Sequence, residues 1–139
     1  MSTFAEIRRR LEKRWTLQQS FPNLVTLEYM IKFKEIHPQH VALRSATVLG
    51  SVPVVRIECD ITAIDRVPAE KVLQRNDAFP FGGIVIRNGR YVVVAAIPLV
   101  SPIRYDFILR VMGELASDAV ALREQAPSTS KTTTAPESR

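Results

Sequence analysis

The chain has 139 residues, of which 46% are hydrophobic and 24% are charged, and its formal net charge is +5. This composition is typical of one globular domain, and it excludes a collagen-like repeat, a disulfide framework and a wholly disordered chain. No apolar run approaches the ~20 residues of a membrane-spanning helix, and the charged N-terminal segment does not resemble a secretory signal. The lone Cys59 suits a reducing compartment. We therefore expect a soluble, cytoplasmic protein.

The positive charge is concentrated near the N-terminus. Residues 1–20 carry a net charge of +3, whereas residues 21–125 carry only +1 and residues 126–139 carry +1. Basic residues on one helix can contact nucleic-acid phosphates, although such a stripe is more often a solvated surface. Both interpretations stay open for four residues of this segment: Arg9, Arg10, Lys13 and Arg14.

The first predicted element is a helix. Thr3 and Glu6 have the spacing of a capping box, and Phe21-Pro22-Asn23 is expected to end the helix and turn the chain. Between them, apolar residues recur every three or four positions and predict one buried stripe: Phe4, Ile7, Leu11 and Trp15.

Three strands are predicted next. Residues 26–34 alternate between apolar and polar side chains, which indicates a strand with one buried face. The His37-Pro38-Gln39-His40 segment predicts a turn, and residues 41–49 form a second, less regular strand. Residues 54–62 alternate again. Short connections between these strands favour an antiparallel meander.

The second half of the chain predicts a short helix, a hairpin and a long helix. Pro68 opens a helix that runs to Arg75, and Asn88-Gly89 lies between two alternating segments, which is the signal of a type I′ turn. Ser101 can cap the long helix, with Pro102 at its first position. The apolar stripe of this helix consists of Tyr105, Ile108, Leu109, Met112, Leu115, Ala116, Ala119 and Leu122.

The predicted order is α-β-β-β-α-β-β-α, which indicates an α+β fold with an antiparallel five-stranded sheet and helices packed on the sheet. The first and last helices are expected on one face. Residues 1–125 form the predicted domain, and residues 126–139 lack any large apolar residue and are expected to be a disordered tail.

No catalytic constellation is visible in the sequence. His37 and His40 are three residues apart, but the predicted turn and the lack of a third firm ligand argue against a metal site. Glu58 and Asp60 alternate with apolar residues, which favours a solvated sheet face over an acid–base pair. Cys59 falls on the apolar side of its strand and is expected to be a packed core thiol. We therefore predict no enzymatic activity, no metal and no cofactor.

Several apolar residues occupy positions where polar ones are expected. Phe107 stands apart from the stripe of the last helix. The others fall on the second face of the sheet: Met30, Val54, Val92 and Val94. We interpret these five residues as a candidate protein-binding or dimerisation surface. The alternative is that the short helix at residues 68–75 covers part of this face.

The sequence resembles YbjN-type proteins, a family that shares the fold of type III secretion chaperones. The resemblance covers roughly residues 3–125. Besides the order of the elements, it rests on five short segments: Val72-Leu73-Gln74-Arg75-Asn76, Phe81-Gly82, Arg87-Asn88-Gly89-Arg90-Tyr91-Val92, Ile97-Pro98-Leu99 and Ala119-Val120-Ala121-Leu122. It implies a bacterial, non-enzymatic module, commonly a homodimer, that binds an extended client segment or acts as a stress or sensory regulator.

Three functional hypotheses follow from the sequence. The leading one is a homodimeric, chaperone-like or regulatory protein-binding module without a cofactor, whose client protein is unidentified. The second is a nucleic-acid-binding protein that uses the basic first helix. The third is an enzyme or small-ligand protein whose site forms only on dimerisation.

Overall fold

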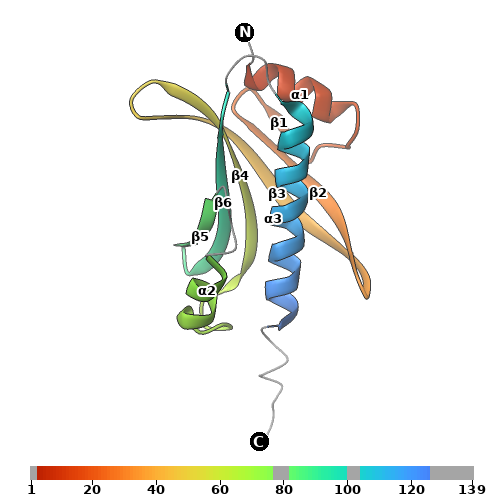
Figure 1. Cartoon of the computed structure of the whole chain (residues 1–139). Coiled ribbons are helices and arrows are strands. Elements are labelled where there is room, and N and C mark those ends of the chain that lie inside the picture. The colour runs from red at the N-terminus through yellow and green to blue at the C-terminus, as the bar shows by residue number, and fades with distance from the viewer. Residues whose placement is uncertain (1–2, 77–81, 100–103, 126–139) are drawn as a thin grey trace, which may run out of the picture.

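The fold consists of a layer of helices on one face of a twisted antiparallel sheet (Figure 1). The computed structural model describes residues 3–76, 82–99 and 104–125. Within this part of the chain there are three helices and six strands: α1 (Phe4–Glu12), β1 (Gln19–Phe21), β2 (Leu24–Phe33), β3 (Glu35–Val48), β4 (Val52–Ala63), α2 (Ala69–Asn76), β5 (Gly82–Arg87), β6 (Arg90–Pro98) and α3 (Tyr105–Gln125). The strands lie side by side in the order β1-β2-β3-β4-β6-β5.

The predicted α+β class is confirmed, but the prediction of five strands is wrong. β1 is an additional strand that pairs with the first residues of β2, so the order becomes α-β-β-β-β-α-β-β-α. The first helix ends at Glu12, well before Phe21. Because all three residues of β1 are exposed, β1 carries no alternating pattern that could have revealed it.

The turn predicted at residues 37–40 is also wrong. The chain reverses three residues before His37, at Lys34, whose φ of 67° is left-handed, and residues 35–48 form one long strand. Pro38 lies opposite Met30 within this strand. It is tolerated there because β4 pairs with β3 only from Val41 onward, which leaves one side of β3 open at the proline.

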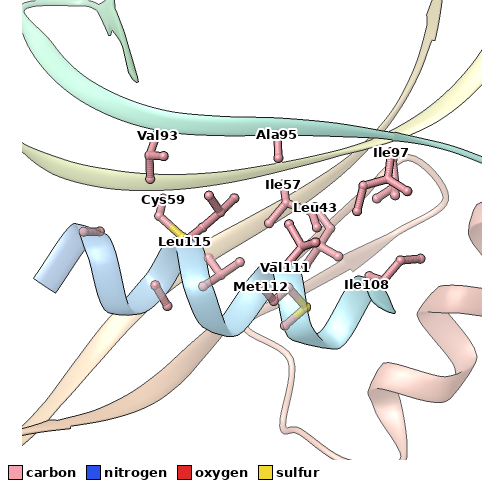
Figure 2. Close-up of a cluster of buried hydrophobic side chains, with 14 of the residues drawn as sticks. Leu43, Ile57, Cys59, Val93, Ala95, Ile97, Ile108, Val111, Met112 and Leu115 are labelled. Carbon is pink, nitrogen blue, oxygen red and sulfur yellow. The ribbon is translucent and has the colours of Figure 1, made fainter. Parts of the chain in front are cut away.

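The core lies between α3 and the sheet (Figure 2). The apolar stripe predicted for the long helix is confirmed, since six of its eight residues are buried and Tyr105 and Leu109 are partly buried; Val111 and Val120 are buried in addition. α1 buries Phe4, Ile7 and Leu11 against the same core, and Trp15 packs at its margin.

α2 packs on the same face of the sheet as α3. Val72 of α2 belongs to the main core, and Arg75 contacts Asp118 of α3 at 3.1 Å. The Tyr91 hydroxyl donates a hydrogen bond of 2.8 Å to the Val67 carbonyl, which fixes the segment before α2. The alternative in which this helix covers the second face is therefore wrong. No helix of the described residues lies on that face.

The β5–β6 hairpin confirms the strongest local prediction. Asn88 and Gly89 have φ values of 53° and 75°, as a type I′ turn requires. The predicted cap at Ser101-Pro102 and the predicted tail at residues 126–139 lie outside the described residues.

Met112 is fully buried at the centre of the core, so Met112→Ala should leave a cavity. We expect the free energy of unfolding to fall by about 2–5 kcal/mol, measured by urea denaturation. Leu49→Ala is the matched control, because Leu49 is 91% exposed and its truncation should cost less than about 0.5 kcal/mol. A loss below about 1 kcal/mol for Met112→Ala would contradict this description of the core.

Candidate interaction surfaces

The second face of the sheet, opposite the helices, contains four of the five apolar residues singled out from the sequence. Met30 is 58% exposed there, but Val54 is only 1% exposed, and Val92 and Val94 are 9% exposed. Phe107 of α3 is partly buried against the main core. The expectation that the three valines form an exposed apolar patch is therefore wrong.

Val92 and Val94 lie on β6, which a long side chain from the neighbouring strand crosses. Arg87 of β5 reaches Glu58 of β4, and β6 lies between these two strands. The Arg87 side chain must therefore pass over β6, on the face that carries Val92 and Val94. Arginine can cover apolar surface with its stem while its guanidinium stays in contact with water.

Glu58 is the centre of this face, and the expectation that it is a solvated carboxylate is wrong. Its side chain is 7% exposed and is contacted by three arginines from three strands. Arg87 donates to both carboxylate oxygens at 2.9 and 3.2 Å, Arg44 donates from Nε at 3.2 Å, and Arg56 lies at 3.5 Å. Register between β3, β4, β6 and β5 brings these residues together, so no local sequence pattern could have revealed the cluster.

The pKa of Glu58 reflects two opposing effects. Burial alone raises the pKa of this carboxyl, but the hydrogen bonds and charges of Arg87 and Arg44 outweigh burial and lower it below its usual value of 4.5. The pKa of Arg87 shifts in the opposite direction, because its hydrogen bond to Glu58 raises it. Glu58 therefore stays ionised under the helix-free face of the sheet.

A second ion pair extends the charged cluster. Arg90 of β6 donates to both oxygens of Asp60 at 2.6 Å, and this contact raises the pKa of Arg90. The guanidinium and the carboxylate are 49% and 40% exposed. Together, the four arginines Arg44, Arg56, Arg87 and Arg90 and their two acidic partners form what we call the arginine face.

A different surface lies at the β5 edge of the sheet, beside α2 (Figure 1). Leu73 of α2 is 64% exposed, Ile86 of β5 is 61% exposed, and Ile64 and Val85 are each 41% exposed. We call Leu73, Ile86 and Ile64 the α2–β5 patch, whereas Val85 lies opposite Val92 and therefore on the other face of β5 from Ile86. Asn76 accepts a hydrogen bond from the Ile84 backbone N–H, so α2 already caps part of the open strand edge. A partner that binds this patch would therefore contact its side chains more than it would pair with the β5 backbone.

A groove of about 440 Å³ lies between β2 and α3. β1 pairs with β2 only as far as Thr26, and no other strand of the described residues pairs with the rest of that edge. Gly113 lets the helix approach β2, because a Cβ at this position would lie 2.9 Å from the Tyr29 hydroxyl. The groove is lined by Tyr29, Ile31, Leu109, Arg110, Gly113, Glu114 and Ser117.

The basic residues of the N-terminal segment are partly engaged with their own chain. Arg10 pairs with Glu6 at 3.7 Å and stacks 5.1 Å above the Tyr105 ring, and Arg14 lies 4.9 Å above the ring of Trp15. All four of these basic residues are exposed, Arg9 and Lys13 included. These contacts hold two of the four predicted phosphate-binding side chains against aromatic rings.

The two histidines lie within β3 and point to opposite faces. His37 lies 3.9 Å from Glu124 of α3, whereas His40 contacts Gln18 at 3.0 Å on the other side. No cluster of three or more metal-ligand side chains occurs in the described part of the chain. Cys59 is fully buried, as predicted, and burial raises the pKa of its thiol.

Comparison of the sequence with protein-family models and with curated proteins found no match. Among the described residues, none of the helices combines the length and apolar character that a membrane span requires.

The charge of Glu58 should stabilise the fold in a pH-dependent way. Because the folded pKa lies below the usual 4.5, this stabilisation is complete above that pH and is lost as the pH falls through the lower folded value. We expect Glu58→Gln to lower the free energy of unfolding by about 1.5–3 kcal/mol at pH 7, with the difference from wild type shrinking toward pH 3.

Urea denaturation measured from neutral pH to pH 3 tests this expectation. The control is Glu35→Gln, which removes an equal charge at an exposed position beside the β2–β3 turn. Equal stability of Glu58→Gln and wild type at pH 7 would refute the role assigned to the carboxylate.

Proposed function

We propose that the protein is a non-enzymatic, chaperone-like protein-binding module that acts as a homodimer. The observation that carries this proposal is the α2–β5 patch, where the apolar side chains of Leu73, Ile86 and Ile64 are exposed at the β5 edge of the sheet beside α2. Exposed apolar patches of this kind mark protein-binding surfaces. A two-fold axis beside α2 would place the patch against its own copy, as a self-complementary interface requires.

The dimer is assigned to this patch and not to the second sheet face. Two copies of the arginine face would bring like charges together, and Val54, Val92 and Val94 offer little exposed area. A stable interface needs about 800 Å² from each partner, so residues around the patch must contribute as well.

The open edge of β2 supports the chaperone-like part of the proposal. An extended segment of a client can add to an unpaired strand edge, and its side chains can enter an adjacent apolar groove. Here the edge beyond Thr26 adjoins the groove that contains Ile31 and Leu109. The buried Cys59 thiol and the divergence of His37 and His40 favour binding over catalysis.

The alternative proposal is nucleic-acid binding through α1 and the residues that follow it. It has weaker support, because Arg10 and Arg14 already contact Tyr105 and Trp15. Arg9, Arg10, Lys13 and Arg14 are all exposed. Such an interface would use Arg9 and Lys13 first, because Arg10 and Arg14 would have to leave their aromatic rings.

The double variant Leu73→Lys with Ile86→Lys should convert a dimer to a monomer, because it places four charges in the interface while both positions tolerate charge in the monomer. Light scattering coupled to gel filtration, at micromolar concentration, measures the mass. Leu49→Lys, at an exposed turn far from the patch, should remain a dimer. A wild-type protein that is monomeric at these concentrations would refute the dimer.

A further inference from the structure

The arginine face carries more positive charge than its own carboxylates require. Arg87 alone satisfies both oxygens of Glu58, at 2.9 and 3.2 Å. Arg44 and Arg56 then add a second and a third guanidinium to the same carboxylate. With the Arg90–Asp60 pair included, four positive charges face two negative charges, so an excess of two positive charges remains on this face.

The register of the strands makes this arrangement of charges less stable. Arg44 lies directly opposite Arg56 on the neighbouring strand, and Arg87 lies directly opposite Arg90. Like charges directly opposite each other destabilise an antiparallel pair. Covering the valines does not require this charge, since uncharged side chains would cover them equally well. The two arginine pairs therefore indicate a surface arranged for an anionic partner.

The guanidinium groups keep donors for such a partner. Arg44 contacts Glu58 through Nε and Arg56 through Nη2, whereas a guanidinium carries five N–H donors. The side chains of Arg44 and Arg56 are 50% and 38% exposed. Glu58 thus holds the guanidinium groups in place, which lowers the entropy lost when a further carboxylate binds.

The spacing of the arginines fits a short segment of chain. They belong to β3, β4, β6 and β5, which are four consecutive strands of the sheet. Arg56 lies opposite Ala96, six residues along β6 from Arg90, so the backbones of the two arginine pairs are about 20 Å apart along the strands. Their side chains converge on Glu58 and Asp60, two positions apart on the same face of β4. Small or apolar side chains lie on the same face as the arginines, among them Ala42, Val92 and Val94.

We propose that the arginine face binds an acidic segment of a partner polypeptide, one that carries Asp or Glu side chains interspersed with apolar residues. Guanidinium groups bind carboxylates through paired hydrogen bonds, as Arg87 and Arg90 already do within this chain. A second copy does not fit, because its own arginine face has the same sign of charge.

Nucleic acid fits this surface less well than an acidic polypeptide. Binding of single strands combines positive charge with aromatic side chains on which bases stack. The described residues of β3, β4, β5 and β6 that share this face include no Phe, Tyr or Trp. Interspersed aliphatic side chains instead match the apolar residues of a peptide. The inference rests on the proposed protein-binding role, but it does not depend on the dimer.

Fluorescence anisotropy at low salt tests the inference with a labelled peptide of repeated Glu-Ala-Glu-Leu. The same peptide with Gln in place of Glu is the ligand control. We expect the acidic peptide to bind and the neutral one not to bind. Arg44→Gln combined with Arg56→Gln should weaken binding at least about tenfold, because charge-assisted hydrogen bonds are lost.

The matched protein control is Arg9→Gln combined with Lys13→Gln, which removes the same total charge from the N-terminal segment and should change the affinity by less than about twofold. Should the face variant fail to fold, NMR of the wild-type protein provides a second test. The Nε–Hε resonances of Arg44, Arg56, Arg87 and Arg90 should shift on titration with the acidic peptide.

Three outcomes would overturn the inference: no binding of the acidic peptide, equal weakening in both double variants, or binding of oligo-dT but not peptide through Arg44 and Arg56. The experiments test the dimer proposal and the acidic-partner proposal independently. A monomeric mass with intact peptide binding removes only the dimer, whereas a dimeric mass without peptide binding removes only the acidic partner.

Discussion

Each strand of a sheet directs alternate side chains to opposite faces, and here all three described helices cover only one of those faces. The covered face has a conventional apolar core centred on α3. The opposite face must exclude water from its valines without a helix above them. This constraint explains why long side chains lie on the surface of the sheet, but it does not explain their excess of positive charge.

Glu58 resolves this constraint by organising the arginines around it. Arg87 crosses β6 to reach the carboxylate, while Arg44 approaches it from β3 and Arg56 from β4, the strand of Glu58 itself. The Arg87 stem then forms a thin cover on the face of β6 that carries Val92 and Val94, and its charged end remains at the surface. The same cluster determines which partners fit, because a net positive face repels its own copy and attracts acidic chains.

Local signals in the sequence predicted most of the fold. Caps and apolar periodicity located α1, α2 and α3, and Asn88-Gly89 located the β5–β6 hairpin, because each of these features depends on residues close together in the chain. β1 was missed because its exposed side chains form no pattern. The β2–β3 turn was misplaced because Lys34, and not glycine, takes the left-handed conformation there.

The binding surfaces were less accessible to sequence reasoning. The sequence correctly placed three valines on the second face of the sheet: Val54, Val92 and Val94. It did not predict that they are buried, because the exposure of a strand residue also depends on side chains from other strands, such as Arg87. Glu58 was predicted to be solvated because polar and apolar residues alternate regularly along its own strand. The three arginines around it come together only through the pairing of β3, β4, β6 and β5. Surfaces of this kind arise from tertiary pairing, which single-strand periodicity does not encode.

The central claim is that one face of the sheet lacks a helical cover. NMR relaxation by a soluble gadolinium chelate, recorded on valine methyl groups at concentrations where the protein is monomeric, tests it directly. The account predicts strong relaxation of Val92 and Val94, which lie on the face without a helix, and weak relaxation of Val93, which lies beneath α3. Equal protection of all three valines would contradict it, because another part of the chain would then cover the second face.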